Sequence, residues 1–135
     1  MILDNVYTNF LQENLFVNNT YKDLAPMIIR KRLVIEGITD TKFEGEKLKE
    51  YMLQLSKLIN MTVVDEPIID YIEEYGYAAY MKWKESGMHV YTWNKTNERP
   101  NFFSIDIYTC KNFNINDVIQ FTSNSFPIKE LTWKE

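Results

Sequence analysis

The spacing of apolar residues predicts a long helix in the first half of the chain. Between residues 44 and 60, apolar side chains recur every three or four positions, at Leu48, Tyr51, Met52, Leu55, Leu58 and Ile59. This interval places them on one face of an amphipathic helix. Thr41 and Glu44 have the spacing of a capping box, so the helix is expected to open with this motif.

Strand patterns occur on both sides of this helix. Residues 28–38 contain the apolar run Leu33-Val34-Ile35 and end beside Gly37, which predicts a strand. Further strand-like segments follow at about residues 62–72, 77–84, 88–94 and 102–108. Glycine or proline indicates turns between them, at residues 75–76, 86–87 and 97–101.

A second helix and a last strand complete the pattern. Asn114 is the expected N-cap of a helix through Ile115, Val118, Ile119 and Thr122, and residues 128–133 resemble a strand. The order β-α-β-β-β-β-α-β favours an α+β fold, a two-layer sandwich with two helices on one face of an antiparallel or mixed sheet. The other face then needs a cover. The simplest cover is the same face of a second copy, which predicts a homodimer.

The first 27 residues are expected to form an N-terminal extension, followed by one domain over residues 28–135. Asp4 as an N-cap, with Val6, Phe10 and Leu15 on one side, indicates a short amphipathic helix. A partly ordered tail that docks on the domain is an equally good interpretation.

Composition narrows the class of protein. A chain of 135 residues with 45% hydrophobic and 15% aromatic residues is typical of one globular domain. The net charge of −4 provides no basic surface for nucleic acid or anionic lipid. No run approaches the roughly 20 apolar residues of a membrane span, and the N-terminus lacks the layout of a signal peptide. The single cysteine excludes an internal disulfide, and we expect a cytoplasmic protein.

The candidate chemistry lies between residues 85 and 110. Ser86, the sole histidine His89 and the sole cysteine Cys110 lie within 25 residues of one another, on strands expected to be adjacent. Residues of equal parity share a face of a strand, so Gly87, His89, Tyr91 and Trp93 should point one way. Ser104, Asp106, Tyr108 and Cys110 should likewise share a face. One histidine and one cysteine do not make a metal site, and no glycine-rich phosphate loop is present.

Structural interpretations of the same residues remain open. Isolated serine, histidine and cysteine residues in a domain of this size are more often structural than catalytic. Cys110 by itself would most often be a small buried apolar residue. Tyr91 and Trp93 are equally suited to sheet packing and to contact with an adenine ring or a cation, whereas packing is favoured for Trp83. A structural interaction domain is therefore one alternative.

Several runs resemble the prokaryotic S-adenosylmethionine (AdoMet) decarboxylases, of which the chain would be a divergent member. Lys31-Arg32-Leu33-Val34-Ile35-Glu36-Gly37 and Met61-Thr62-Val63-Val64-Asp65-Glu66 resemble the opening of that family. Glu85-Ser86 followed by Thr92-Trp93, and then Asp106-Ile107-Tyr108-Thr109-Cys110, resemble its signature. The resemblance covers about residues 28–119.

The resemblance implies a self-processing, pyruvoyl-dependent lyase of spermidine biosynthesis. The Ser86 hydroxyl would attack the carbonyl of Glu85, and elimination would leave residue 86 as a pyruvoyl cofactor, with no metal. The new carbonyl would condense with the amino group of AdoMet and withdraw electrons as carbon dioxide leaves. Cys110 matches the cysteine that returns a proton to the α-carbon. Trp93 and Glu98 are expected to contact the substrate, Glu98 at a ribose hydroxyl.

Two residues depart from the family pattern. The family usually has a histidine five residues after the serine, where this chain has Tyr91, and a serine or threonine eight residues before it, where this chain has Ala78. A tyrosine, with a pKa of about 10, is a poor base at neutral pH. His89 shares the face of Tyr91 and is an alternative base. These replacements suggest an alternative, an unprocessed relative that binds AdoMet or a related ligand, or partners an active subunit. Within the decarboxylase class, a member that acts on another amino acid such as ornithine or arginine is a variant.

Overall fold

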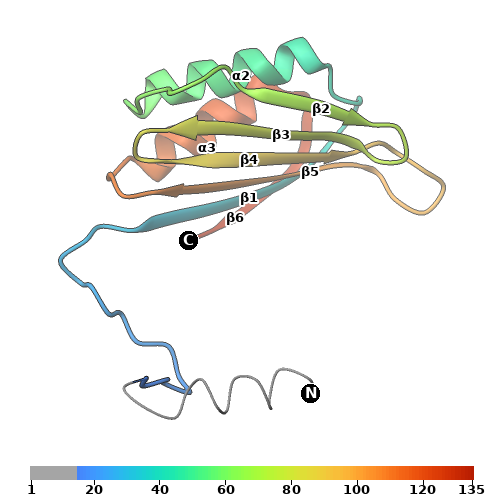
Figure 1. Cartoon of the computed structure of the whole chain (residues 1–135). Coiled ribbons are helices and arrows are strands. Elements are labelled where there is room, and N and C mark those ends of the chain that lie inside the picture. The colour runs from blue at the N-terminus through green and yellow to red at the C-terminus, as the bar shows by residue number, and fades with distance from the viewer. Residues whose placement is uncertain (1–14) are drawn as a thin grey trace.

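The computed structural model describes residues 15–135, which form a six-stranded sheet with two helices on one of its faces (Figure 1). The elements are β1 (Lys31–Thr39), α2 (Gly45–Leu58), β2 (Ile68–Ile72), β3 (Gly76–Trp83), β4 (Ser86–Trp93), β5 (Asn101–Thr109), α3 (Ile115–Ser125) and β6 (Ile128–Lys134). The strand order is β2-β3-β4-β5-β1-β6, and every neighbouring pair is antiparallel. The predicted α+β sandwich is confirmed, and its sheet is antiparallel.

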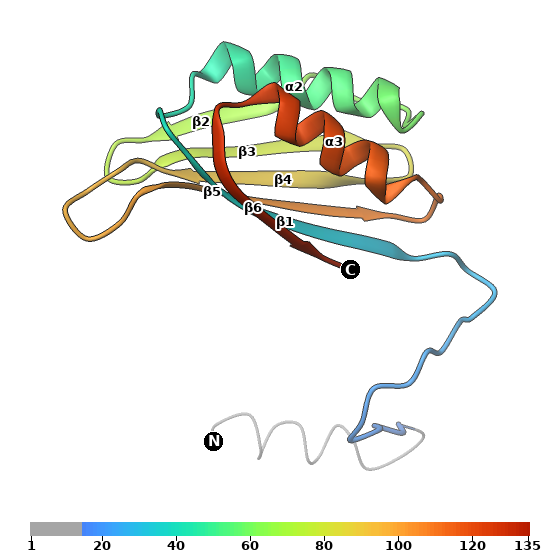
Figure 2. The same cartoon turned by 180° about the vertical axis from the view of Figure 1, so that it is seen from behind.

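The core lies between the helices and the sheet, because both contribute apolar side chains at the expected period. On α2 the buried residues include Leu48, Met52 and Leu55, which share one helical face. Each central strand buries every second residue, as Met88 and Val90 do on β4. Figure 2 shows both helices across the same face, so within residues 15–135 no helix covers the opposite face of the sheet.

The observed helix caps confirm one prediction and correct another. The Asn114 side chain accepts a hydrogen bond from the N–H of Asp117 at 3.1 Å, so it caps α3 as predicted. The capping box at Thr41 was wrong, because α2 begins after Glu44 and has no side-chain cap. The Thr41 carbonyl oxygen instead accepts a hydrogen bond from the Thr39 hydroxyl at 2.7 Å, which turns the chain before the helix begins.

The strand predicted over residues 62–72 is shorter than expected. Residues 62–64 make only an irregular contact with the end of β3, through a single bridge between Val63 and Trp83, and β2 begins at Ile68. Pro67 stands directly before β2. Proline has no N–H for a sheet ladder, so it is found at the start of a strand rather than inside one.

The N-terminal segment leaves β1 on the side of the sheet opposite the helices (Figure 1). Residues 15–30 contain no helix or strand, and Phe16, Tyr21 and Met27 are largely exposed. The helix suggested by Asp4, Val6 and Phe10 lies outside the described residues. The domain boundary near residue 28 stays a prediction. In the part of the chain that the structure describes, neither helix has the length and apolar character needed to cross a bilayer.

Candidate active site

The uncovered face of the sheet, which we call the open face, carries most of the candidate residues. On β4, His89 and Tyr91 are exposed on this face, while the intervening Val90 is buried under the helices. On β5, Asp106 and Tyr108 are exposed in the same way. The predicted grouping by parity is confirmed. The sheet register then decides which of these side chains are neighbours.

Aromatic rings form a continuous stripe along the open face. The His89 ring lies 4.6 Å from that of Tyr80 on β3 and 6.1 Å from that of Tyr91. The stripe continues from Tyr91 to Trp93 and then to Phe102 on β5, with ring centroids 6.3 and 5.4 Å apart. An exposed aromatic stripe of this length is typical of a surface that another molecule covers.

Trp83 belongs to the opposite, buried face. Its side chain is 1% exposed, and its indole N–H donates to the Ser56 hydroxyl at 2.7 Å. The interpretation of Trp83 as a packing residue is confirmed.

The turn that presents Ser86 differs from the prediction. The hairpin between β3 and β4 turns at Lys84 and Glu85, and Ser86 is already paired with Trp83 as the first residue of β4. The predicted turn at residues 86–87 is therefore wrong by two positions. The φ angle of Ser86 is 135°, a value that L-residues other than glycine rarely adopt. The hairpin therefore holds the backbone of Ser86 in a strained conformation.

A shallow pocket of about 550 Å³ lies beside this turn and gathers three predicted site residues. Ser86, His89 and Cys110 all line it, together with Glu85 and Asp106. Cys110 is exposed, so the interpretation of this residue as a buried apolar side chain is wrong. The structure thus brings together the serine, the imidazole and the thiol that the sequence singled out.

The other predicted site residues lie far from Ser86 within one chain. Tyr91 is five residues further along β4, a separation of about 17 Å at the usual rise of a strand. Trp93 ends β4, and Glu98 follows in the connection to β5, so both lie beyond Tyr91. Tyr91 and Trp93 line a separate pocket of about 410 Å³ together with Ala78. Within one chain, therefore, the predicted site residues Tyr91, Trp93 and Glu98 do not reach Ser86.

The carbonyl group that precedes Ser86 is held by the residue that directly follows the neighbouring strand, β5. The N–H of Cys110 donates a hydrogen bond to the Glu85 carbonyl oxygen at 3.0 Å. This N–H polarises the carbonyl and points to the position where negative charge would develop on its oxygen during nucleophilic attack. Cys110 therefore contributes a backbone donor to one side of the turn and an exposed thiol to the pocket.

The side chain of Glu85 is fixed by a residue that the sequence did not indicate. Thr62 donates its N–H to Glu85 Oε1 at 2.9 Å and its hydroxyl to Oε2 at 3.0 Å. The hydrogen bond from the Thr62 N–H is the main reason that the pKa of the Glu85 carboxyl lies below its usual value. Thr62 lies 23 residues away, outside any local motif, so only the fold shows this contact.

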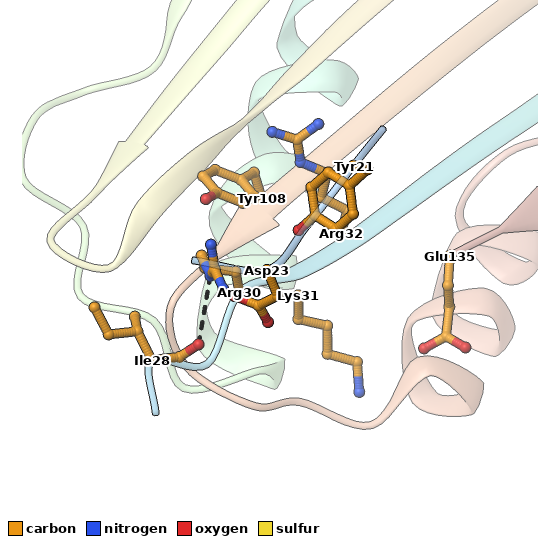
Figure 3. Close-up of a pocket in the computed structure, with 8 residues that line it drawn as sticks. All are labelled: Tyr21, Asp23, Ile28, Arg30, Lys31, Arg32, Tyr108 and Glu135. Atoms are coloured by element: carbon orange, nitrogen blue, oxygen red, sulfur yellow. Dashed lines mark hydrogen bonds and ion pairs between the residues drawn. The ribbon is translucent and has the colours of Figure 1, made fainter. Parts of the chain in front are cut away.

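Arg32 and Tyr108 form a second feature that the sequence did not indicate. The Arg32 guanidinium lies over the Tyr108 ring, 4.5 Å from its centroid, and both residues line the pocket beside Ser86. Both also line a larger pocket of about 760 Å³ together with Tyr21 and Ile28 of the N-terminal segment (Figure 3). The N-terminal segment therefore lies next to the candidate site. Within residues 15–135, no group of three histidine, cysteine, aspartate or glutamate side chains is placed to hold a metal ion.

The strain at Ser86 leads to a stability prediction. We expect Ser86→Gly to be more stable than Ser86→Ala by about 1 kcal/mol, because relief of about 1–3 kcal/mol of strain exceeds the roughly 0.4–1 kcal/mol lost to the flexibility of glycine in the unfolded chain. Neither variant has a hydroxyl at position 86, so both can be compared as whole chains by urea unfolding. Equal stabilities would show that position 86 is unstrained.

The contact between Glu85 and Thr62 predicts a pH dependence. A carboxyl whose pKa is lowered by folding stabilises the fold above its unfolded pKa of about 4.3, and this contribution is lost as the pH falls through the folded pKa. Unfolding of the Ser86→Ala chain between pH 3 and 7 should therefore show a loss of stability on the acid side. Adding Glu85→Gln should reduce that loss, whereas Glu73→Gln, at an exposed turn, should not. Identical pH profiles for the two variants would contradict the prediction.

The comparisons with known proteins agree with the resemblance seen in the sequence. A family model described as S-adenosylmethionine decarboxylase matches residues 37–135. The match begins nine residues later than the resemblance suggested and continues past residue 119 to the end of the chain. It contains both helices, the β3–β4 hairpin and Cys110. No curated protein matches the chain.

Proposed function

Because the chain belongs to the S-adenosylmethionine decarboxylase family, we propose that it cleaves itself between Glu85 and Ser86 and then decarboxylates AdoMet. The product would supply aminopropyl groups for spermidine synthesis. The observation that carries the proposal is the arrangement at the hairpin turn, where a strained serine follows a carbonyl held by the Cys110 N–H. The thiol of the same cysteine is exposed beside them.

Self-cleavage makes use of this arrangement. The Ser86 hydroxyl attacks the Glu85 carbonyl carbon, and the Cys110 N–H, 3.0 Å from the carbonyl oxygen, stabilises the negative charge that develops there. The attack moves the acyl group of Glu85 from the nitrogen to the oxygen of Ser86. Breaking this peptide bond frees residue 86 from its unfavourable φ angle, so the strain favours the reaction. The fixed Glu85 side chain keeps the turn in place during the attack.

The surroundings of Ser86 fit a pyruvoyl group. The pocket beside Ser86 has a volume of about 550 Å³, which is in the range of small-molecule sites, and Ser86 and Cys110 both line it. When formed, the pyruvoyl group supplies the carbonyl that condenses with the substrate amine and withdraws electrons during loss of carbon dioxide. The Cys110 thiol would hold the proton that returns to the α-carbon of the product. Arg32 and Tyr108 form one wall of the pocket and would orient the substrate.

A homodimer through the open face would complete the site. Tyr91, Trp93 and Glu98 lie too far from Ser86 to act on it in the same chain. A second copy packed on the aromatic stripe would cover the stripe and could present its own Tyr91 and Trp93 to the Ser86 pocket. We therefore propose that these residues act across the dimer, with Tyr91 assisting catalysis and Trp93 and Glu98 contacting the substrate.

Intact mass measurement tests the proposal directly. Matured wild-type protein should separate under denaturing conditions into two chains, residues 1–85 and 86–135, and the second should carry a carbonyl-reactive end. Ser86→Ala should remain a single 16.2 kDa species and should release no carbon dioxide from AdoMet. A wild-type chain that stays whole, or turnover by Ser86→Ala equal to that of the wild type, would refute the proposal.

Two residues that differ from the family's usual pattern support one other function. Ala78 and Tyr91 form a directly opposed pair on β3 and β4, at the two positions where the family usually has a hydroxyl and an imidazole. A chain unable to process itself would bind AdoMet without turnover or partner an active subunit. Calorimetry that shows AdoMet binding to an uncleaved wild-type chain would support this second function.

A further inference from the structure

Two adjacent residue pairs on the open face of the β3–β4 hairpin differ in their chemistry. The first pair, Ala78 and Tyr91, occupies the positions of the family's usual hydroxyl and imidazole but offers neither a side-chain hydroxyl at 78 nor an imidazole at 91. The next pair toward the turn, Tyr80 and His89, offers both. Because residues two apart on a strand share a face, the two pairs face the same way. The hydroxyl and imidazole are therefore present, but one pair closer to Ser86.

The position of the Tyr80 ring brings its hydroxyl toward the reacting residue. The ring stacks on His89 with an interplanar angle of 29° and extends across Gly87. A Cβ atom at position 87 would lie 3.2 Å from Tyr80 Cε1 and 3.3 Å from the Tyr80 hydroxyl oxygen. The absence of a side chain at Gly87 thus allows the phenol to lie over the residue that follows Ser86. Tyr80, His89 and Ser86 all line the same pocket.

Several charged and titratable groups surround His89. Asp106 is its directly opposed neighbour on β5, and Tyr80 is its neighbour on β3. The other such groups that line the pocket or stack on the ring are Tyr91, Lys82, Lys84, Glu85, Tyr108, Cys110 and Arg32. The ring is exposed, so solvent moderates all of these charges. Histidine is the most frequent general base in enzymes, so His89 is the candidate proton acceptor of this pocket.

We propose that Tyr80 and His89 are the hydroxyl and the base of self-cleavage in this chain, one residue pair closer to Ser86 than the family pattern places them. This inference rests on the proposed function. Tyr80 donates a hydrogen bond to the tetrahedral intermediate at Glu85, as a second donor beside the Cys110 N–H. His89, three residues from Ser86 along β4, takes the proton from the Ser86 α-carbon through one water in the pocket that both residues line. Its stack with Tyr80 fixes the ring for that transfer.

Self-cleavage consists of an acyl shift followed by an elimination. In the acyl shift, the Ser86 oxygen forms a bond to the Glu85 carbonyl carbon, the bond from that carbon to the Ser86 nitrogen breaks, and the hydroxyl proton passes to the nitrogen. In the elimination, His89 takes the α-proton, the bond between Cβ and the ester oxygen breaks, and Glu85 leaves as a carboxylate. The resulting enamine takes up a proton at Cβ, and water then replaces its nitrogen, which is released as ammonia.

Variants of the two residues should stop the reaction at different stages. Tyr80→Phe keeps the stacked ring but loses the hydroxyl, so cleavage should slow by about 10²–10³-fold without accumulation of an ester. His89→Gln should permit the acyl shift and slow the elimination by about 10²–10⁴-fold, so that an ester accumulates. Hydroxylamine splits esters and not peptide bonds, so it should cut the His89→Gln chain after Glu85, as intact mass would show.

Controls separate this chemistry from a structural role. Tyr77→Phe loses a hydroxyl on the same strand but on the helix side, near Gly45, and should cleave at the wild-type rate. The pH profile of the elimination should differ between the wild type and His89→Gln, because the glutamine amide cannot accept the α-proton. Each substitution is also placed in the Ser86→Ala chain, where unchanged urea unfolding shows that the fold is intact.

The outcomes distinguish the two proposals. Wild-type cleavage with an unaltered rate in Tyr80→Phe, or with no ester in His89→Gln, overturns this inference and leaves the proposed function standing. A wild-type chain that never cleaves overturns both. Slow cleavage in Tyr80→Phe, ester in His89→Gln and normal cleavage in Tyr77→Phe together support the inference.

Discussion

Changing Cys110 to alanine is expected to lower the rate of AdoMet decarboxylation by about 10²–10⁴-fold, the usual contribution of a general acid. Self-cleavage should continue at close to the wild-type rate. The reason is that, in the proposed function, Cys110 contributes to the two reactions through different groups. Its N–H holds the Glu85 carbonyl oxygen at 3.0 Å, and alanine keeps this N–H, whereas the thiol alone is lost. Cleavage is followed by intact mass and decarboxylation by release of carbon dioxide.

A serine at position 110 is the matched variant for this experiment. Its hydroxyl has nearly the size of the thiol but holds its proton more tightly, so the decarboxylation rate should again fall while cleavage continues. If Cys110→Ala stopped self-cleavage, the thiol rather than the backbone N–H would be the group that acts on the Glu85 carbonyl. If decarboxylation survived unchanged, Cys110 would not be the proton donor.

Changing Trp83 to alanine is expected to cost about 3–5 kcal/mol of stability, a large share of the roughly 5–15 kcal/mol that holds a domain folded. The indole is 1% exposed and packs between the sheet and α2. Its N–H donates to the Ser56 hydroxyl, which in turn donates to the Met52 carbonyl oxygen at 2.7 Å. The substitution therefore leaves a cavity and removes one link of a buried chain of hydrogen bonds.

Urea unfolding of the Ser86→Ala chain measures this cost on a single species. Trp133→Ala is the matched control, because that indole is 45% exposed on β6, an edge strand, and its removal should cost under about 1 kcal/mol. Similar losses of stability for the two substitutions would show that the surrounding side chains fill the cavity left by Trp83→Ala. Trp83 also pairs directly with Ser86, so its packing holds the β3–β4 hairpin that presents the serine.

Much of the fold follows from local patterns in the sequence. Helix α2 lies within the predicted range, because side chains three and four residues apart share one face of a helix wherever it packs. The faces of His89 and Asp106 were also predictable, because parity along a strand is independent of the strand's neighbours. The Asn114 cap depends only on the three residues that follow it. In each case the residues that determine the feature lie within a few positions of one another in the sequence.

The errors occurred where a hydrogen bond or strand pairing that the residue pattern does not show competes with a local signal. Thr41 had the spacing of a helix cap, but its carbonyl oxygen bonds to the Thr39 side chain and the helix begins later. The turn at Gly87 was predicted from glycine alone, whereas pairing of Trp83 with Ser86 moves it to residues 84–85. Sheet register is a property of two strands together, so the pattern of one strand cannot locate the turn.

The sequence by itself therefore determined the class of fold and the faces of the strands, and it singled out Ser86, His89 and Cys110 as candidate site residues. Tertiary structure alone decided that the Cys110 N–H holds the Glu85 carbonyl, that Thr62 fixes the Glu85 side chain, and that Tyr80 stacks on His89. The physical reason is that these relations depend on the register between strands far apart in the chain. Register is set by the packing of the whole sheet against its helices.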